Sequence, residues 1–292
     1  MNTLAEPAAM PAGVVARSLR YPRLLSIAGS DSGGGAGIQA DLKTFAALGC
    51  HGMTAITALT AQNTLGVRAI HAVPAGMVRD QIDAVIEDIG VDAVKIGMLH
   101  CADIVRTVAA AIDRHALECV VLDPVMMSTS GARLIDDTAQ EVLVSELFRR
   151  ATVITPNLDE AALLVGKAIE SEAAMESAAR QLLAMGANAV LLKGGHLAGD
   201  TVSDLLLTGD GSARWMRAPR IPTGNTHGTG CTLSSAIAAH LALGASLPQA
   251  VDLARAYVRG ALQAGASVRT GAGSGPLNHG HAPVTMRLLP LS

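Results

Sequence analysis

Short apolar runs alternate with longer amphipathic segments along most of the chain. The run at 24–28 has the pattern of a buried strand, and Ile38, Leu42 and Phe45 then recur at the spacing of one buried helix face. The alternation predicts an α/β fold, with one mostly parallel sheet and helices on both of its faces. The predicted strands are 24–28, 52–60, 93–96, 119–122, 152–155 and 189–192, with extended runs near 202–206 and 213–218, and the predicted helices are 38–45, 74–88, 101–115, 138–148, one opening at 157, 171–185, 228–243 and 248–264.

The strongest single motif reads Asn-Thr-His-Gly-Thr-Gly-Cys-Thr over residues 225–232. An apolar helical pattern begins directly after its glycines. The first N–H groups of a helix lack internal partners, and the helix dipole makes that end positive. The motif therefore predicts an anion site, most naturally for phosphate, at Gly228, Thr229 and Gly230. Cys231 lies beside it, and a thiol at a helix N-terminus has a lowered pKa that suits a base or nucleophile. The alternative is a glycine-rich turn followed by a buried core cysteine.

A second glycine-rich turn, at residues 30–37, separates the first predicted strand from the first predicted helix. It is not a Walker A loop, because Gly-Lys-Ser/Thr does not follow, and it matches the dinucleotide fingerprint only weakly. The acid that this fingerprint needs about 20 residues later is missing, which argues against an oxidoreductase. In the next helix, Asp41 is either a polar anchor for a substrate or an ordinary acid near a helix start. Gln62, after the second strand, is either a reader of a planar hydrogen-bonding ligand or a loop cap.

Asn157 and Glu160 lie three residues apart across a predicted helix start, where both can face the same side. This oxygen-bearing pair suits Mg²⁺, which takes one or two protein carboxylates and keeps several waters. A capping box explains the same two residues equally well. Lys193, at a strand end, can neutralise a phosphate. Because side chains at the carboxyl ends of parallel strands share one edge, these groups and the anion site predict a single cleft for phosphoryl transfer. Cys231 is placed there to take the proton of the acceptor.

The composition narrows the functional classes. The net charge of −3 over 292 residues gives no broad attraction for nucleic acid or anionic lipid. The aromatic residues are few and scattered, so they form no base-stacking platform. No apolar run reaches the roughly 20 residues of a membrane span. The 4 cysteines show no metal spacing and favour a reducing, cytoplasmic setting. We expect residues 1–20 to form a disordered leader and residues 21–292 a single domain.

Seven blocks of sequence stand out in order: AGSDSGGGAGIQADLK at 28–43, TALTAQNT at 57–64, KIGML at 95–99, LDPVM at 122–126, ITPNLDE at 154–160, KGGH at 193–196 and NTHGTGCT at 225–232. In this order they resemble the hydroxymethylpyrimidine/phosphomethylpyrimidine kinases of thiamine biosynthesis, in the ribokinase-like superfamily. The resemblance runs from about residue 24 to residue 281. One departure is Asp-Ser-Gly-Gly-Gly at the first turn, where many relatives have Asp-Pro-Ser-Gly-Gly. That change should alter the stiffness of the loop and leave its chemistry intact.

The resemblance implies a three-layer α/β/α fold and ATP-dependent phosphorylation, with Mg²⁺, of 4-amino-5-hydroxymethyl-2-methylpyrimidine to its monophosphate and then its diphosphate. Room for the first phosphate could come from the glycine-rich turns at 33–37 and 228–230. Cys231 stands where most sugar kinases of the superfamily carry an aspartate base, although the acceptor could instead lose its proton late, to the phosphoryl oxygens. The implied site consists of Gln62, Asp41, Ala28, Gly29, Met98 and Val125 around the pyrimidine, Lys193, Thr226, His227 and Asn157 around ATP, Glu160 and Asp123 at the metal, and Cys231 with Gly228, Thr229 and Gly230 in catalysis.

Two other functions stay open. A pyridoxal kinase would share this cleft, because related enzymes accept both kinds of ring. A non-catalytic pyrimidine-binding module is the second, and Cys231, Lys193 and Glu160 argue against it. The expected partners are the small pyrimidine and ATP, without nucleic acid or membrane. The resemblance also suggests a homodimer or higher homo-oligomer.

Overall fold

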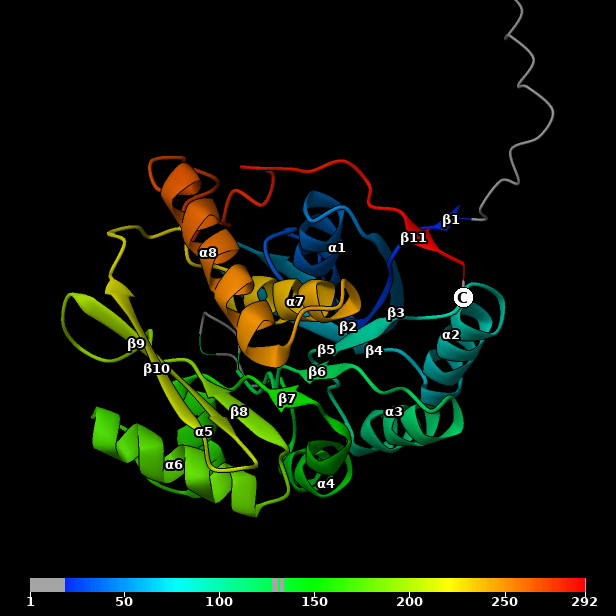
Figure 1. Ribbon diagram of the computed structural model, residues 1–292, viewed down its shortest axis with the longest axis horizontal. Helices are drawn as coiled ribbons and strands as arrows, with labels where there is room; N and C mark the ends of the chain where they lie inside the picture. The colour runs from blue at the N-terminus through cyan, green and yellow to red at the C-terminus, as the bar shows by residue number, and fades with distance from the viewer. Residues whose placement is uncertain (1–18, 128–130, 132–133, 292) are drawn as a thin grey trace, which may run out of the picture.

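A central sheet with helices on both faces makes up the computed structural model, which describes residues 19–127, 131 and 134–291 (Figure 1). The sheet has nine strands in the order β10-β9-β8-β7-β6-β5-β2-β3-β4. Neighbours from β8 to β3 pair in parallel, whereas β4, β9 and β10 pair antiparallel at the two edges. The predicted mostly parallel α/β sheet is therefore confirmed. Its strands are β2 (Arg23–Asp31), β3 (His51–Asn63), β4 (Gly66–Ala72), β5 (Ala93–Ile96), β6 (Val120–Leu122), β7 (Val153–Ile154), β8 (Ala189–Leu192), β9 (Thr201–Thr208) and β10 (Ala213–Pro219).

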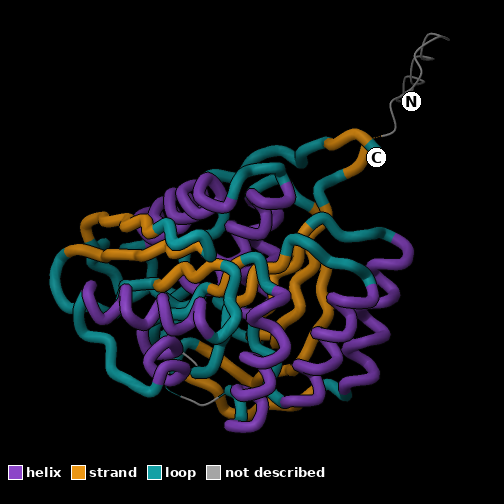
Figure 2. The backbone as a smooth tube through the Cα atoms, turned by 60° about the horizontal axis from the view of Figure 1, so that its bottom comes forward, coloured by secondary structure: helices purple, strands orange, loops and turns teal. Residues whose placement is uncertain are grey.

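Each face of the sheet has its own apolar core, as both faces of a parallel sheet require. Helices α1, α7 and α8 bury Phe45 and Ile237 on one face, and α2 to α6 bury Ile82 and Leu182 on the other (Figures 1 and 2). Within the described residues, no helix combines the length and apolarity that crossing a membrane requires. The helices are α1 (Gly37–Ala47), α2 (Ala75–Asp88), α3 (Ala102–Arg114), α4 (Asp137–Leu147) with a 3₁₀ turn (Phe148–Arg150), α5 (Leu158–Val165), α6 (Glu172–Ala184), α7 (Thr229–Ala242) and α8 (Leu247–Gly265).

Strand β4 has no counterpart among the predicted strands. It pairs antiparallel with β3 at the edge of the sheet, and most of its side chains are exposed or half-buried. An edge strand of this kind carries no apolar run, because it buries little on either face. Polar residues such as Arg68 and His71 interrupt the apolar pattern of β4, so hydrophobic periodicity does not predict this strand.

The two ends of the described chain lie side by side (Figure 2). Strand β1 (Leu19–Arg20) pairs antiparallel with β11 (Leu289–Pro290). Residues 1–18 of the expected leader lie outside the described residues. Leu19 and Arg20 belong to the expected leader as well, but in the structure they pair with β11. The folded part of the chain therefore begins before residue 21.

Candidate active site

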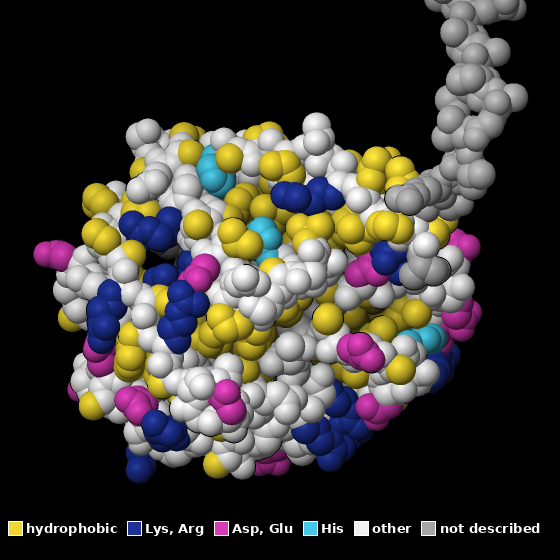
Figure 3. Space-filling view, in the orientation of Figure 1, with side chains coloured by type: hydrophobic (Ala, Val, Ile, Leu, Met, Phe, Trp, Pro, Cys, Tyr) yellow, Lys and Arg dark blue, Asp and Glu magenta, His cyan; other side chains and the backbone are white. Residues whose placement is uncertain are grey.

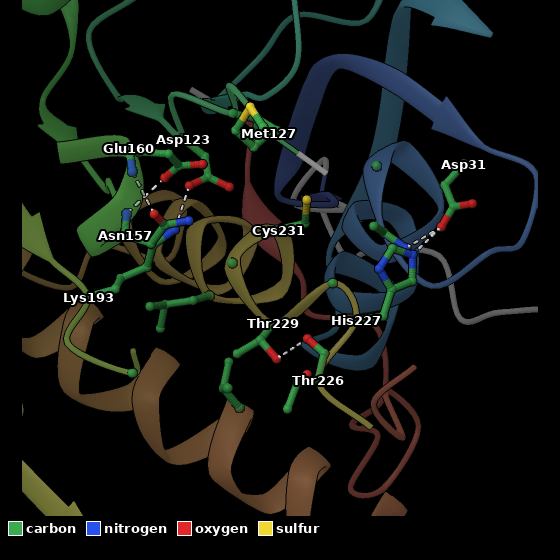
Figure 4. Close-up of a pocket in the computed structure, with 18 of the residues that line it drawn as sticks. Asp31, Asp123, Met127, Asn157, Glu160, Lys193, Thr226, His227, Thr229 and Cys231 are labelled. Atoms are coloured by element: carbon green, nitrogen blue, oxygen red, sulfur yellow. Dashed lines mark hydrogen bonds and ion pairs between the residues drawn. The ribbon is translucent and has the colours of Figure 1, made fainter. Parts of the chain in front are cut away.

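One cavity of about 600 Å³ runs along the carboxyl ends of the parallel strands. Every residue that the sequence suggested for a catalytic, ligand-binding or metal-binding role lines it, except Asp41. Figure 4 shows Asp31 and His227 toward one end of this cavity, Asp123, Asn157, Glu160 and Lys193 toward the other, and Cys231 between them. The cavity therefore has two chemically different ends joined by the first turn of α7.

The N-terminus of α7 forms one wall. Gly228 caps the helix with a φ of 85°, in the left-handed region where L side chains are strained. A Cβ at Gly228 would lie 1.8 Å from the carbonyl oxygen of Gly35, so the two glycine-rich motifs touch backbone to backbone. A Cβ at Gly230 would lie 3.0 Å from Nζ of Lys193. The absence of side chains here lets an anion approach the positive end of the helix with a lysine beside it.

The amides of the first glycine-rich turn already have an acceptor. The Asp31 carboxylate accepts hydrogen bonds from the backbone N–H groups of Gly33 (2.8 Å), Gly35 (3.0 Å) and Ala36 (2.9 Å). Burial alone would raise the pKa of Asp31, but hydrogen bonds from His227, Ala36 and Gly33 bring it below its ordinary value. The turn is therefore a self-contained structure around a carboxylate, and the start of α7 is the wall left open to an anion.

The end of the cavity nearest β2 and β3 combines an apolar lining with the amide of Gln62 and the Asp31–His227 pair. Oε1 of Gln62 accepts from the Thr60 hydroxyl (3.1 Å), and its Nε2 lies 3.4 Å from Nε2 of His227. The single Thr60 hydroxyl proton also reaches the Ser30 carbonyl oxygen at 2.8 Å, so both the oxygen and the N–H groups of Gln62 can serve a ligand. The apolar lining here comes from Ala28, Gly29, Met98 and Val125, as the resemblance implied for a ring pocket.

Asp41 lies beneath this end and outside the lining of the cavity. Its carboxylate is fully buried and accepts from Oγ of Ser26 (2.6 Å), Oγ of Ser235 (2.7 Å) and Nζ of Lys95 (2.9 Å). Protein donors already satisfy this carboxylate, and the expected direct contact of Asp41 with the ring stays a prediction. Lys95 is equally buried, yet it borders the cavity. Burial opposes its charge, but the Asp41 carboxylate outweighs that effect and raises the pKa of Lys95.

Sequence reasoning assigned no role to Lys95. The signal that could have found it is a lysine inside the otherwise apolar strand β5, since a fully buried lysine needs a partner.

The opposite end carries a cluster of charges (Figure 4). Nζ of Lys193 lies 2.8 Å from Oδ1 of Asp123, and Oδ1 also accepts from the Thr155 hydroxyl (3.0 Å). The N–H of Asn157 donates to Oε2 of Glu160, and the N–H of Glu160 donates to Oδ1 of Asn157, both at 2.8 Å. This reciprocal pair is the capping box considered as the alternative to a metal site, and it is confirmed at the start of α5.

The charge balance of this cluster favours the binding of a further cation. Burial raises the pKa of Glu160 to about 7, with Lys193 opposing the rise and Asp123 adding to it. A divalent cation would therefore relieve the two buried carboxylates. Within the described residues, no group of three or more His, Cys, Asp and Glu side chains could hold a metal by itself. The residues fit a Mg²⁺ held by one or two carboxylates together with phosphate oxygens, which is the common arrangement in kinases.

Cys231 lies half-buried between the two ends of the cavity. Burial raises the pKa of its thiol to about 11, with the Lys95 ammonium opposing the rise and the Asp41 and Asp123 carboxylates adding to it. The expected lowering of this pKa is therefore wrong for the protein without ligands, because desolvation outweighs the helix dipole. A thiol that is neutral at pH 7 is a weak base. Any base catalysis by this thiol is therefore weak, and the route in which the acceptor loses its proton late, to the phosphoryl oxygens, stays open beside it.

Lys and Arg side chains surround a hollow on the face shown in Figure 3. Among those lining the cavity, Arg220 donates to the carbonyl oxygens of Gly195 (2.7 Å), Leu197 (2.6 Å) and Gly199 (2.9 Å). It therefore holds the loop that follows Lys193. No sequence pattern indicates this role, since the partners of Arg220 are backbone carbonyls that only the fold brings together.

Comparison with known proteins agrees with this geometry. The sequence model of the family described as phosphomethylpyrimidine kinase matches residues 31–278. A hydroxymethylpyrimidine/phosphomethylpyrimidine kinase of Rhizobium meliloti is 52% identical over 258 residues, which cover 88% of this chain and 96% of that protein. One of Streptomyces coelicolor is 51% identical over 261 residues, covering 89% and 95%. Among solved structures, a Bacillus subtilis pyridoxal kinase in an ADP complex is 37% identical with a TM-score of 0.82, covering 89% of this chain and 98% of that one. A phosphomethylpyrimidine kinase of Clostridium difficile is 42% identical with a TM-score of 0.72, covering 82% and 98%.

Proposed function

The chain belongs to the phosphomethylpyrimidine kinase family, and we propose that it uses Mg·ATP to phosphorylate 4-amino-5-hydroxymethyl-2-methylpyrimidine twice. In the first step the hydroxymethyl oxygen attacks the γ-phosphorus, the bond from that phosphorus to the β,γ-bridging oxygen breaks, and ADP and a proton leave. In the second step an oxygen of the new monophosphate attacks the γ-phosphorus of another ATP. The product is the diphosphate used in thiamine biosynthesis.

The apolar end of the cavity supports the pyrimidine as acceptor. Ala28, Gly29, Met98 and Val125 form a lining that suits a small planar ring. The Gln62 amide offers N–H groups that match the acceptor nitrogens of an aminopyrimidine and an oxygen that matches its amino group. Asp41 supports this end from beneath, where it holds Lys95 and Ser235 of α7.

The charged end supports ATP as the donor. The first turn of α7, at Gly228, Thr229 and Gly230, offers a glycine-lined anion hole for the transferring phosphoryl group. Lys193 stands beside it as a cation, and Thr226 and Asn157 line the same cavity. Bound Mg²⁺ would neutralise the triphosphate charge, and Asp123 and Glu160 are the residues that would hold it. The start of α7 also leaves room for the acceptor phosphate in the second step.

The observation that carries the proposal is that both ends belong to one cavity of about 600 Å³, which falls within the usual size of small-molecule sites. Product analysis by anion-exchange chromatography tests it, starting from the pyrimidine alcohol and Mg·ATP. We expect the monophosphate to appear first and then decline as the diphosphate accumulates. Monophosphate that accumulates without diphosphate would restrict the activity to the first step, and neither product would contradict the proposal.

Gln62→Ala is expected to raise KM for the pyrimidine by about 5–10-fold, because it removes one or two neutral hydrogen bonds to the ring. The turnover number kcat should stay within about threefold, since these bonds persist from ground state to transition state. Steady-state kinetics with the pyrimidine varied and then ATP varied measure both effects. An equal rise in KM for ATP would contradict a contact between Gln62 and the pyrimidine ring.

Cys231→Ala is expected to lower kcat by about 10–100-fold while KM for the pyrimidine changes little. General bases contribute about 10²–10⁴-fold, and a thiol with a pKa of about 11 stands at the weak end of that range at pH 7. Single-turnover measurements with saturating Mg·ATP isolate the chemical step. Normal turnover in the variant would remove Cys231 from the proton path.

We also propose a cytoplasmic homodimer or higher homo-oligomer. All four cysteines are free, which agrees with a reducing compartment. The β4 edge of the sheet has no partner strand within the described chain, and Leu65 beside it is 65% exposed, which supports an interface between copies there. Light scattering of the purified chain would give its mass directly, and a monomer would contradict this part of the proposal.

A further inference from the structure

Three segments that carry the proposed substrate sites meet at one hydrogen-bonded pair. Oδ2 of Asp31, at the end of β2, lies 2.9 Å from Nε2 of His227, just before the N-cap of α7. Both side chains are almost fully buried. The lowered pKa of Asp31 keeps it a carboxylate at neutral pH, and a carboxylate only accepts hydrogen bonds. Nε2 of His227 therefore carries a proton and donates a hydrogen bond to Asp31, so the Gln62 amide nitrogen 3.4 Å away does not donate to that atom.

The third segment is the end of β3. The N–H of Gln62 donates to Oγ of Ser32, and the Ser32 hydroxyl donates to the carbonyl oxygen of Gln62, both at 2.8 Å. Ser32 belongs to the turn that Asp31 organises. The residue that reads the ring is thus bonded to the turn, and the turn is bonded to the start of α7 through His227.

Packing reinforces this connection. A Cβ at Gly35 would lie 2.5 Å from Cδ2 of His227, so the turn rests directly on the imidazole ring. In Figure 4 the ring points toward Asp31, on the side of Cys231 away from Lys193. His227 also lines the cavity next to Gly228, so the nucleotide contact that the family resemblance implied for it stays a prediction.

We propose that Asp31 and His227 form a positioning pair, which holds the anion hole of α7 in register with the acceptor end of the cavity. The pair touches neither reacting atom. It fixes the distance between the acceptor oxygen, held near Gln62, and the phosphorus, held at Gly228–Gly230. This inference deepens the proposed function, because it concerns the approach of the two substrates in the same cavity.

A positioning role predicts a specific kinetic pattern. Each substrate still finds its own end of the cavity when the pair is broken, so the two KM values change little. The reacting atoms no longer meet at the productive distance, and misplacement by about 1 Å can cost about 100-fold in rate. We therefore expect His227→Ala to lower kcat by about 10–100-fold for both phosphorylations, with both KM values within about threefold.

Two further variants separate this role from a structural one. His227→Gln keeps an N–H donor near the Nε2 position and should recover most of kcat, which simple loss of stability would not predict. Asp31→Asn replaces one acceptor oxygen by a donor, and the double variant Asp31→Asn/His227→Ala should be about as slow as the slower single variant. The matched control is His115→Ala, which breaks the His115–Asp83 pair of 2.8 Å outside the cavity and should leave kcat unchanged.

Amide hydrogen exchange gives a readout that does not depend on the acceptor. His227→Ala should speed amide exchange at residues 33–36 and at residues 228–231 together. His115→Ala should leave exchange in both segments unchanged. The proposal is overturned if His227→Ala keeps kcat within about twofold, if its whole effect is on KM for ATP, or if His227→Gln is no better than His227→Ala. If the wild-type chain phosphorylates pyridoxal and not the pyrimidines, the proposed function fails, and the same kinetic comparison is made with pyridoxal. If the wild-type chain phosphorylates no acceptor, hydrogen exchange in His227→Ala still tests the positioning pair. Faster exchange in only one of the segments 33–36 and 228–231 overturns the proposal.

Discussion

Replacing Lys193 by methionine is expected to lower kcat by about 10³-fold. The ammonium lies 2.8 Å from Asp123 and beside Gly230, where the phosphoryl group would pass. Methionine keeps the length of the side chain but removes the charge, so Asp123 and Glu160 face the incoming triphosphate without compensation. Removal of one preorganised donor costs about 10²–10³-fold, and loss of a cation at a transferring phosphoryl group costs about 10³–10⁵-fold.

The effect belongs mainly to kcat, because negative charge on the phosphoryl oxygens is redistributed as transfer proceeds. Initial rates over a matrix of ATP and pyrimidine concentrations measure it. Lys167→Met is the matched control, since Lys167 is exposed and lies outside the cavity lining, and it should match the wild type. A Lys193→Met variant with normal kcat and only a raised KM for ATP would contradict a role in transfer and leave Lys193 as a binding residue.

Lys95→Met is expected to destabilise the fold by about 3–5 kcal/mol, which is the range for breaking a buried ion pair from one side. Lys95 and Asp41 both have 0% of their side chains exposed, with 2.9 Å between Nζ and Oδ2. Without the lysine, the Asp41 carboxylate keeps only the hydroxyls of Ser26 and Ser235 in a site closed to water. Urea unfolding followed by circular dichroism measures the change, and the melting temperature should fall by on the order of 10 °C.

The double variant Lys95→Met/Asp41→Asn provides the control. It removes both charges, so it should recover most of the stability that Lys95→Met loses, because no buried charge is left without a partner. Ser26→Ala should cost about 1.5–3 kcal/mol, less than Lys95→Met, since it removes one hydrogen bond to a charged group. A Lys95→Met variant that unfolds within about 1 kcal/mol of the wild type would contradict the account of this network.

The pattern of apolar residues was sufficient to predict the layers of the fold, because the central strands are buried on both faces. The pattern at 93–96 and 189–192 coincides with β5 and β8, where every residue is buried. Strand β4 was missed because an exposed edge needs no apolar run. The position of the cavity was predictable because ligands bind at the carboxyl ends of the strands in parallel sheets. This rule depends on topology and not on the contacts of any one side chain.

The sequence was insufficient at the site where contacts distant in sequence decide the chemistry. The helix position of Asp41 was read correctly, but Lys95 and Ser235, which bury its charge, come from other elements. The thiol of Cys231 sits at a helix start as expected, yet burial by the surrounding segments raises its pKa. The tie from Asp31 to His227 spans the two glycine-rich motifs and cannot be seen in either alone.

The most direct test of the central claim is a coupled assay of ADP release with Mg·ATP. The pyrimidine alcohol, its monophosphate and pyridoxal serve as acceptors side by side, with ATP alone as the blank. We predict ADP release with both pyrimidines above the blank, as a kinase that performs both steps requires. Release with pyridoxal alone would make the protein a pyridoxal kinase, and release that no acceptor stimulates would contradict the assignment of the cavity as a kinase site.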